Sequence, residues 1–325
     1  MINLRFKPFD YLNPHLDPPA GTSSELIADF YFFVVAIDHR TSSPSGTAFE
    51  GYLDGKFFHG ADLLYALAVQ KLRDDPDFFS AERMAQISDE EVGEWLSLVI
   101  NEERVVIYNP QERADLLRDS GESLLQLGYK SSIELVKRSE GYVLRKKGIG
   151  LLQLLKNFKA YSDPVSKKSY LWIKFLTGRG LLDIQDLDNL NVPVDNHLSR
   201  IALRTGIVNV KNKEIQGRLR QEQPFTVSED LELREAIRNA FKEILNYKKL
   251  KFNELDDLFW VLGRTHCIHS ENPVCQNYVH NPECQLMVVL KVNCQQYCPL
   301  GSGCRGFKEL QYRELLEPNI RTFFY

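Results

Sequence analysis

The sequence predicts a mostly helical protein of two closely packed lobes, followed by a cysteine-rich loop. Apolar residues recur at helical spacing through most of the 325 residues, and short stretches rich in Gly, Pro and Ser separate these segments. All six cysteines fall within residues 267–304. The composition, 43% hydrophobic and 26% charged, is ordinary for a globular protein. No apolar run reaches the roughly 18 residues of a membrane span.

The N-terminal segment and the cysteines suggest a compartment. Residues 1–7 lack the long apolar core of a signal peptide, so we expect a cytoplasmic, monomeric protein without a membrane partner. Clustered cysteines in that compartment hold metal more often than they form disulfides. An extracellular disulfide scaffold is the alternative.

The first elements are expected to be two helices and a hairpin. Ser23 can cap a helix over 26–37, although the ambiguous period of this segment also allows a buried strand. Residues 41–57 are rich in turn-forming residues and predict a loop with a small hairpin. Residues 59–73 then form a strong amphipathic pattern, which predicts the second helix.

The rest of the chain is predicted to be helical with short connections. Asp195 is well placed as an N-cap, and Thr226 with Glu229 has the spacing of a capping box. We expect an N-terminal lobe over 1–140, a second helical lobe over 141–263, and a loop and tail over 264–325. The predicted helices cover 89–100, 110–127, 131–138, 149–158, 166–177, 195–206, 212–220, 228–247 and 253–263.

The net charge of −4 conceals an asymmetry. Residues 74–103 hold ten acidic side chains and one Arg, whereas residues 141–182 hold nine basic side chains and one acid, Asp163. This local basic excess suits a phosphate-bearing partner, and it is equally typical of a solvated helix face. The nine basic residues are Arg145, Lys146, Lys147, Lys156, Lys159, Lys167, Lys168, Lys174 and Arg179.

Residues 192–207 carry the first motif, Val-Pro-Val-Asp-Asn-His-Leu-Ser-Arg-Ile-Ala-Leu-Arg-Thr-Gly-Ile. As plain structure, this is a capped helix with an exposed basic edge. The run also resembles the Val-Asp-Thr-His-Val-x-Arg-hydrophobic-x-x-Arg-x-Gly signature of the helix–hairpin–helix (HhH-GPD, endonuclease III-like) DNA glycosylases. That resemblance implies an all-α, two-lobed glycosylase-like fold with Asp195 as catalytic carboxylate. Such a carboxylate can stabilise the oxocarbenium character that develops at the sugar, or activate water. We expect His197, Arg200 and Arg204 to bind phosphate.

Residues 258–267, Leu-Phe-Trp-Val-Leu-Gly-Arg-Thr-His-Cys, are similar to the apolar helix that leads into the iron–sulfur loop of that superfamily. The family pattern there is Cys-x6-Cys-x2-Cys-x5-Cys, which binds a [4Fe–4S] cluster. The resemblance implies Cys267, Cys298 and Cys304 as ligands. The fourth is Cys294, beside Cys298, or Cys275; Cys284 lies in an insertion. A zinc site using four of the six thiols is the alternative.

Residues 162–180 depart from the family. The glycine hairpin that contacts a DNA phosphate in those enzymes is missing here. Lys167 and Lys174 are nevertheless candidate phosphate-binding residues, and Lys168 is a candidate catalytic lysine, although none aligns securely with the family's Schiff-base lysine.

The N-terminal half resembles a second family, the queuosine-salvage glycohydrolases. The similarity lies in Tyr-Leu-Asp-Gly-Lys-Phe-Phe-His-Gly-Ala-Asp-Leu-Leu-Tyr-Ala-Leu at 52–67, in the acidic stretch before Trp95, and in the aromatic end at 320–325. Under this resemblance, Asp195 is a pocket carboxylate and Asp256 lies near a second one.

The sequence therefore supports three functional expectations. The first is a DNA glycosylase of base-excision repair, and the second is a glycohydrolase acting on a modified nucleoside or nucleotide. The third is a non-catalytic nucleic-acid-binding protein with a structural cluster. Trp172 and Trp260 lie on apolar helical faces and are expected in the core rather than against bases.

Overall fold

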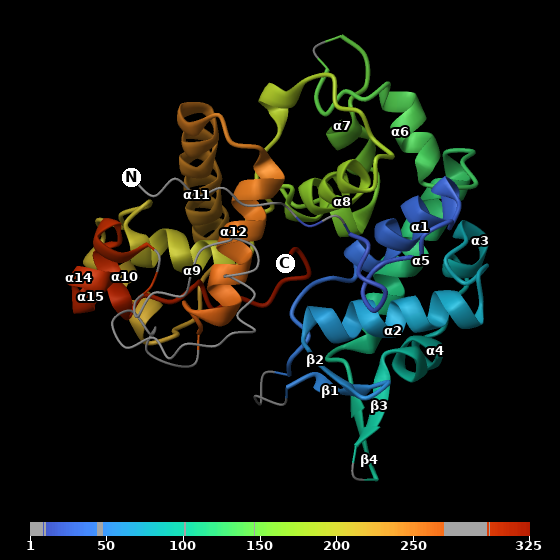
Figure 1. Cartoon of the computed structure of the whole chain (residues 1–325), viewed down its shortest axis with the longest axis horizontal. Helices are drawn as coiled ribbons and strands as arrows, with labels where there is room; N and C mark the ends of the chain where they lie inside the picture. The colour runs from blue at the N-terminus through green and yellow to red at the C-terminus, as the bar shows by residue number, and fades with distance from the viewer. Residues whose placement is uncertain are drawn as a thin grey trace. The chain divides into compact units, whose positions relative to one another are not determined.

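The computed structural model describes residues 9, 11–43, 48–100, 102–145, 147–269, 298 and 300–325 (Figure 1). These residues are mostly helical, as predicted, and two short hairpins supply the strands. None of the helices among them combines the length and apolar character needed to span a bilayer.

The chain divides into two compact units. Unit 1 comprises Met1–Phe9 and Asn191–Arg321, and unit 2 comprises Asp10–Leu190 and Thr322–Tyr325. The main division therefore falls between 190 and 191, whereas the sequence-based lobes divide at 140 and 263. Unit 2 is a continuous stretch of chain together with the 322–325 segment, and unit 1 combines residues from before and after it.

Unit 2 is built around α1 (Ser24–Ala36), whose residues 27–36 are all buried. A helix that is apolar on every side belongs at the centre of a core, which explains the ambiguous sequence period of this segment. Phe32 stacks on Tyr161 with 5.1 Å between ring centroids, and Trp172 donates a hydrogen bond from Nε1 to Ala28 O (3.2 Å). Trp172 is fully buried, so its predicted core position is confirmed.

The other elements of unit 2 surround α1. Helices α2, α5, α6 and α8 pack against it. The elements are α2 (Ala61–Asp74), α3 (Ala81–Met84), α4 (Asp89–Trp95), α5 (Pro110–Gln126), α6 (Ile133–Ser139), α7 (Leu151–Leu155), η1 (Lys159–Tyr161), α8 (Lys167–Gly178) and η2 (Leu187–Asn189).

Two antiparallel hairpins complete unit 2. Strands β1 (Glu50–Leu53) and β2 (Lys56–His59) pair with Glu50 opposite His59, and this hairpin confirms the one predicted within 41–57. Strands β3 (Ser97–Ile100) and β4 (Glu103–Val106) pair with Ser97 opposite Val106. The helix predicted over 89–100 is therefore wrong beyond Trp95. Its last residues are partly β-branched and find a strand partner after a tight turn, which local periodicity does not reveal.

Unit 1 is arranged around α9 (Asn196–Thr205), against which four other helices pack. The elements of unit 1 are α9, α10 (Lys213–Arg220), α11 (Val227–Lys248), α12 (Phe252–Thr265), η3 (Gly301–Gly303), α14 (Arg305–Lys308) and α15 (Leu310–Arg313). Thr226 and Glu229 form the predicted capping box of α11. Helix α9 carries the first sequence motif, and α12 leads into the cysteine segment, so the two motifs share one unit.

Candidate functional site

Asp195 is the N-cap of α9, as its sequence context predicts. Its backbone is extended, and its Oδ1 accepts a hydrogen bond from Leu198 N (2.9 Å). This bond satisfies one of the N–H groups that have no partner in the first turn of a helix. The residue is half-buried, so its carboxylate is fixed in direction without being fully removed from solvent.

His197, in the first turn of α9, lies against α12. A Cβ added to Gly263 would come within 2.7 Å of His197 Cβ, so this close approach requires glycine. The His197 ring makes an edge contact with Trp260, with 6.3 Å between centroids. Burial lowers the pKa of His197, against the opposing influence of Asp195. Arg200 Nη2 lies 3.0 Å from His197 Nδ1, and a guanidinium can only donate, so the ring is neutral with its proton on Nε2.

Arg200 is buried and ties α9 to two neighbouring segments. It donates from Nε to Cys267 O (2.6 Å), from Nη2 to Gly263 O (2.9 Å), and from Nη1 to Glu317 Oε1 (2.6 Å). Only about 1% of the residue is exposed. In this geometry the guanidinium is committed to groups of the protein. Its expected contact with phosphate stays a prediction.

Arg204, one turn further along α9, holds the same region. It donates from Nη1 to Ile268 O (2.7 Å) and from Nε to Leu315 O (2.8 Å), and Nη1 lies 3.5 Å from Cys267 Sγ. Arg204 is also buried, so the basic edge expected to be exposed on α9 faces the interior of unit 1 instead. The helix that carries the glycosylase-like signature thus holds Cys267 and Ile268, where the cysteine-bearing part of the chain begins.

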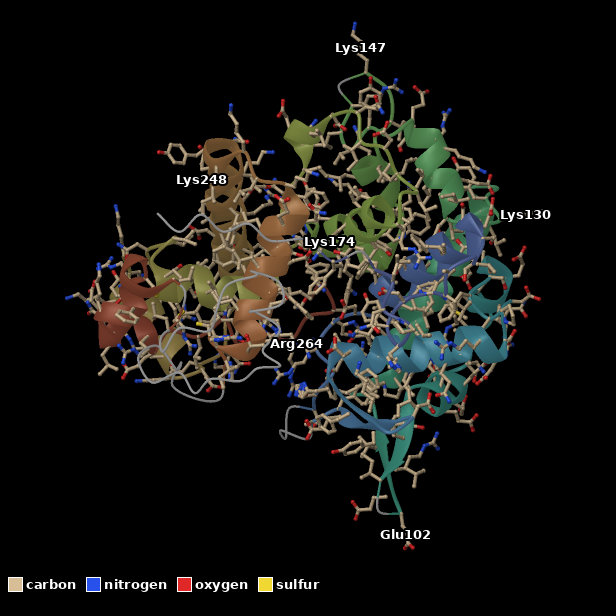
Figure 2. The ribbon with its side chains drawn as sticks, viewed as in Figure 1. Glu102, Lys130, Lys147, Lys174, Lys248 and Arg264 are labelled. Carbon is tan, nitrogen blue, oxygen red and sulfur yellow. The ribbon has the colours of Figure 1, made fainter. Side chains whose placement is uncertain are left out.

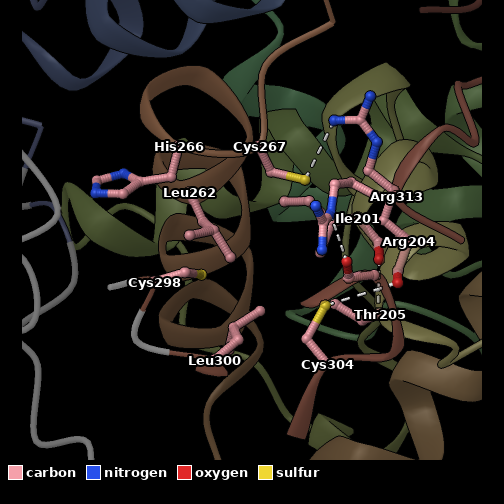
Figure 3. A pocket seen from close by; sticks show the side chains of 11 residues that line it. Ile201, Arg204, Thr205, Leu262, His266, Cys267, Cys298, Leu300, Cys304 and Arg313 are labelled. Carbon is pink, nitrogen blue, oxygen red and sulfur yellow. Dashed lines mark hydrogen bonds between the residues drawn. The ribbon is translucent and has the colours of Figure 1, made fainter. Parts of the chain in front are cut away.

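Three cysteine side chains line one hollow in unit 1. The hollow has a cavity volume of about 20 Å³, and Figure 3 shows the sulfur atoms of Cys267, Cys298 and Cys304 around it. Cys267 lies two residues after the end of α12, whereas Cys304 immediately precedes α14. The short helix α14 lies close to α9, because a Cβ on Gly306 would come within 2.9 Å of Arg204 O. Apolar side chains of Ile201, Leu262 and Leu300 complete much of the wall.

The side chains around the hollow have the chemistry expected of a metal centre bound by thiolates. Three soft sulfur ligands surround one space, and the neighbouring Arg204 can stabilise negative charge on a thiolate. Burial raises the pKa of the Cys304 thiol. Within the described part of the chain, no three His, Cys, Asp or Glu side chains are arranged closely enough to hold a metal ion. Cys275, Cys284 and Cys294 lie outside the described residues, so the fourth ligand stays a prediction.

Glu317 is a site residue that the sequence did not reveal. It is nearly buried, and its Oε1 accepts from both Arg200 and His269. Burial opposes its charged form, but the charge of Arg200 and the hydrogen bonds outweigh this and lower the pKa of Glu317 to about 2. It lies 117 positions from Arg200 in a segment without a motif, so no local signal could have identified it.

Asp256, the second predicted carboxylate, lies in α12 and is buried, as is its neighbour Asp257. Asp257 Oδ2 accepts a hydrogen bond from Phe9 N (2.8 Å). Both carboxylates therefore belong to unit 1, with Asp195. Trp260, expected in the core, is only half-buried, and the guanidinium of Arg264 lies 4.5 Å from its ring centroid.

The lysines expected to bind phosphate or act in catalysis are buried in unit 2. Lys168 donates to Ala36 O (2.5 Å), and Lys167 donates to Asp38 O (3.1 Å). Arg113 adds bonds to the carbonyls of Ile37, His39 and Arg40. Helix α1 has no basic residue in its own last turn, so Lys168 and Arg113 cap it at Ala36 and Ile37, and Lys167 holds the carbonyl that follows.

Lys174 also differs from the exposed lysines of the basic stretch. It is about 5% exposed, and its amine lies 5.9 Å from the Tyr11 ring. Lys147, in contrast, projects outward (Figure 2). The basic excess of 141–182 is therefore divided between interior caps and exposed positions, and Lys167, Lys168 and Lys174 form no part of a solvated face.

Comparison of the chain with protein-family models and with curated proteins gives no match in either case.

Proposed function

We propose that this chain is an N-glycosidase that hydrolyses a base–sugar bond, with Asp195 as its central carboxylate. We also propose that its helices follow the helix–hairpin–helix glycosylase plan. One observation supports this proposal above others. The helix capped by Asp195 also holds Cys267 and Ile268, through Arg200 and Arg204. The two sequence motifs that resemble DNA glycosylases predict a carboxylate at the start of a helix and a cysteine site. In unit 1 a thiol-lined hollow lies beside the helix that Asp195 caps.

The chemistry assigned to Asp195 follows from its position. As the C–N bond breaks, its electron pair leaves with the base and positive charge develops on the sugar. A fixed carboxylate stabilises that charge and can take the proton of an attacking water, whose oxygen bonds to the anomeric carbon. The departing base gains a proton from solvent. The neutral His197 beside Asp195 acts as a positioning residue, because its Nδ1 accepts from Arg200.

The proposed cofactor is a [4Fe–4S] cluster held by Cys267, Cys298, Cys304 and either Cys294 or Cys275. When bound, such a cluster crosslinks the segments that bear its thiolates, and its role here is structural. Arg204 would face the ligand sulfur of Cys267.

The base–sugar bond that is cleaved belongs to DNA in the leading proposal, because the motifs around Asp195 and Cys267 resemble DNA glycosylases. A second candidate is a free modified nucleoside or nucleotide. The burial of Lys167, Lys168 and Lys174 favours it, because these side chains offer no exposed basic groove to a polynucleotide.

Base release tests both candidates. The full chain is incubated with duplex and single-stranded DNA containing damaged or modified bases, and separately with a panel of free modified nucleosides and nucleotides. Released bases are measured by mass spectrometry. We expect Asp195→Asn to lower the rate by at least about 100-fold. Glu232→Gln, an exposed change on α11, should leave it intact.

The outcomes separate the proposals. Release from DNA alone supports the glycosylase, and release from free nucleosides alone supports the salvage activity. Salt-dependent DNA binding without any release supports the non-catalytic protein and contradicts the glycosidase. Full activity of Asp195→Asn would show that the mechanism is wrong.

Metal analysis tests the cofactor. Protein purified without oxygen is assayed for iron, sulfide and zinc, and its absorbance near about 400 nm is recorded. We expect iron and sulfide to be lost in Cys304→Ser and retained in Cys284→Ser, because Cys284 lies in the insertion. If the protein is colourless and contains zinc, the cluster is contradicted and a zinc site is supported.

A further inference from the structure

Trp260 differs from the other two tryptophans of the chain. Trp95 and Trp172 are buried in unit 2, with 8% and 0% of their area exposed, whereas Trp260 on α12 is half-buried. A large aromatic side chain that stays accessible to solvent forgoes part of the burial that stabilises the others. Accessible aromatic rings are also the side chains on which nucleic-acid bases stack. Trp260 is therefore a candidate contact for the base whose bond Asp195 would cleave.

Trp260 and Asp195 are both neighbours of His197. The His197 ring makes an edge contact with Trp260 at 6.3 Å between centroids, and the Asp195 carboxylate acts on His197 electrostatically. Because Gly263 has no side chain, His197 Cβ can pack directly on α12. The packing of α9 on α12 thus fixes Trp260 relative to the carboxylate.

Arg264 lies one helical turn after Trp260, in the last turn of α12 (Figure 2). Its guanidinium carbon lies 4.5 Å from the Trp260 ring centroid, and the residue is half-buried. A guanidinium that stacks on an indole keeps its N–H donors at its edge. Burial is the main cause of the lowered pKa of His197, and the charge of Arg264 adds to it. A carboxylate, an aromatic surface and a cationic donor therefore meet around one histidine.

Cleavage of a base–sugar bond develops opposite charges on the two fragments. In the proposed function, Asp195 stabilises the positive charge of the sugar. The base leaves with the electron pair of the C–N bond and carries negative charge until it gains a proton from solvent. A fixed cationic donor against the base lowers the barrier, because it stabilises charge that develops in the transition state. Asp195 by itself leaves this half of the reaction without a protein group.

We propose that Trp260 and Arg264 form the base-binding side of the Asp195 site. The base stacks on the accessible part of the indole, and Arg264 donates a hydrogen bond to a ring nitrogen or carbonyl oxygen of the base as the C–N bond breaks. The guanidinium stays protonated throughout, so the proton that the base gains still comes from solvent. This assignment rests on the proposed function and adds the two residues that act on the leaving group.

Base binding without catalysis is the first test. Adenine, hypoxanthine and uracil are titrated separately into the full chain, and tryptophan fluorescence is recorded. We expect at least one base to quench the emission, because Trp260 is the one tryptophan that is not buried. Trp260→Phe should abolish the quenching and Trp95→Phe should retain it. If no base quenches, the base-binding site is contradicted, whatever the protein does in base release.

The leaving-group dependence of base release is the second test. Each substrate that releases a base is compared with an analogue whose halogenated base is more acidic and leaves more readily. We expect Arg264→Gln to lower kcat about 100-fold for the first and clearly less for the second. Trp260→Ala should lower kcat/KM about tenfold, and Trp260→Phe should restore most of it. Arg321→Gln, an exposed arginine of unit 1, is the control and should change neither.

The outcomes distinguish this assignment from the proposed function. If a base quenches Trp260 but no substrate releases a base, the glycosidase is contradicted and the base-binding site is supported. If bases are released and Arg264→Gln slows both kinds of substrate equally, the glycosidase stands and the leaving-group role of Arg264 is wrong. If Trp260→Ala matches the parent in kcat/KM, the stacking role is wrong.

Discussion

The buried basic side chains of the two units have different structural roles. In unit 2, Lys168 and Arg113 donate to the carbonyls of Ala36 and Ile37 at the end of α1, and Lys167 donates to Asp38 O just after it. These cations complete a helix end. In unit 1, Arg200 and Arg204 donate to the carbonyls of Cys267 and Ile268, so they fix a segment that bears a candidate metal ligand. A basic residue that the sequence predicts to bind phosphate can therefore be buried and bonded to the protein itself. The group that it holds decides whether its role is structural or whether it supports a functional site.

The buried carboxylates of the two units also differ. Glu317 in unit 1 faces Arg200, and its pKa falls to about 2. Asp29 in unit 2 accepts, among the residues that the structure describes, from Ser131 and Ser132 alone, which are neutral, and burial raises its pKa to about 6. Acidification below about pH 4.5 should therefore remove the stabilisation that Glu317 gives unit 1, whereas protonation of Asp29 does not destabilise unit 2.

Arg113→Met should have the largest effect and tests the helix cap of unit 2. It leaves the carbonyls of Ile37 and His39, which are buried, and of Arg40 without their donor. We expect a loss of about 3 to 5 kcal/mol in the free energy of unfolding. Chemical denaturation measures it. Arg138→Met, an exposed arginine of α6, should change little. Equal stabilities would show that the cap is dispensable.

Glu317→Gln tests the ion pair of unit 1. The pKa of Glu317 is lowered on folding, so its stabilisation is complete above about pH 4.5 and is lost as the pH falls toward 2. At pH 7 we expect the variant to lose about 3 kcal/mol. Denaturation at pH 7 and at pH 3 should show a smaller difference at the lower pH. The exposed Glu314→Gln serves as control.

Asp29→Asn should act in the opposite sense in unit 2. The pKa of Asp29 is raised on folding, so the parent protein gains stability as the pH falls from 6 toward 4. All three donors bond to Oδ1, which Asn retains. We expect the variant to be more stable by about 2 to 3 kcal/mol at pH 7.5 and unchanged near pH 4. Destabilisation at pH 7.5 would contradict the assignment.

Gly263→Ala should have the smallest cost and probes the contact between α9 and α12. Its Cβ would meet His197 Cβ at 2.7 Å, so we expect a loss of about 1 to 2 kcal/mol. Gly217→Ala in α10 meets no atom within 4 Å and should stabilise the protein by up to about 1 kcal/mol. Thermal unfolding of both variants measures the difference. Opposite shifts in Tm would show that the cost at Gly263 comes from packing and not from replacing a helical glycine.

Local sequence predicted much of this fold and part of the site. Periodicity located most helices, and the N-cap role of Asp195 and the capping box at Thr226 are confirmed, because these features depend on neighbouring residues. The strand over 97–100 was missed because its partner follows a turn. The buried roles of Arg200 and Lys168 could not be predicted, since their partners lie 67 and 132 positions away.

The bond between Phe9 N and Asp257 Oδ2 has a consequence for how the protein is made. It joins residues 248 positions apart, and both belong to unit 1, while residues 10–190 of unit 2 lie between them in the chain. During synthesis, most of unit 2 emerges before α12 exists. We therefore expect unit 2 to gain protection from proteolysis on the ribosome first, while unit 1 closes only after residue 257 has left the exit tunnel.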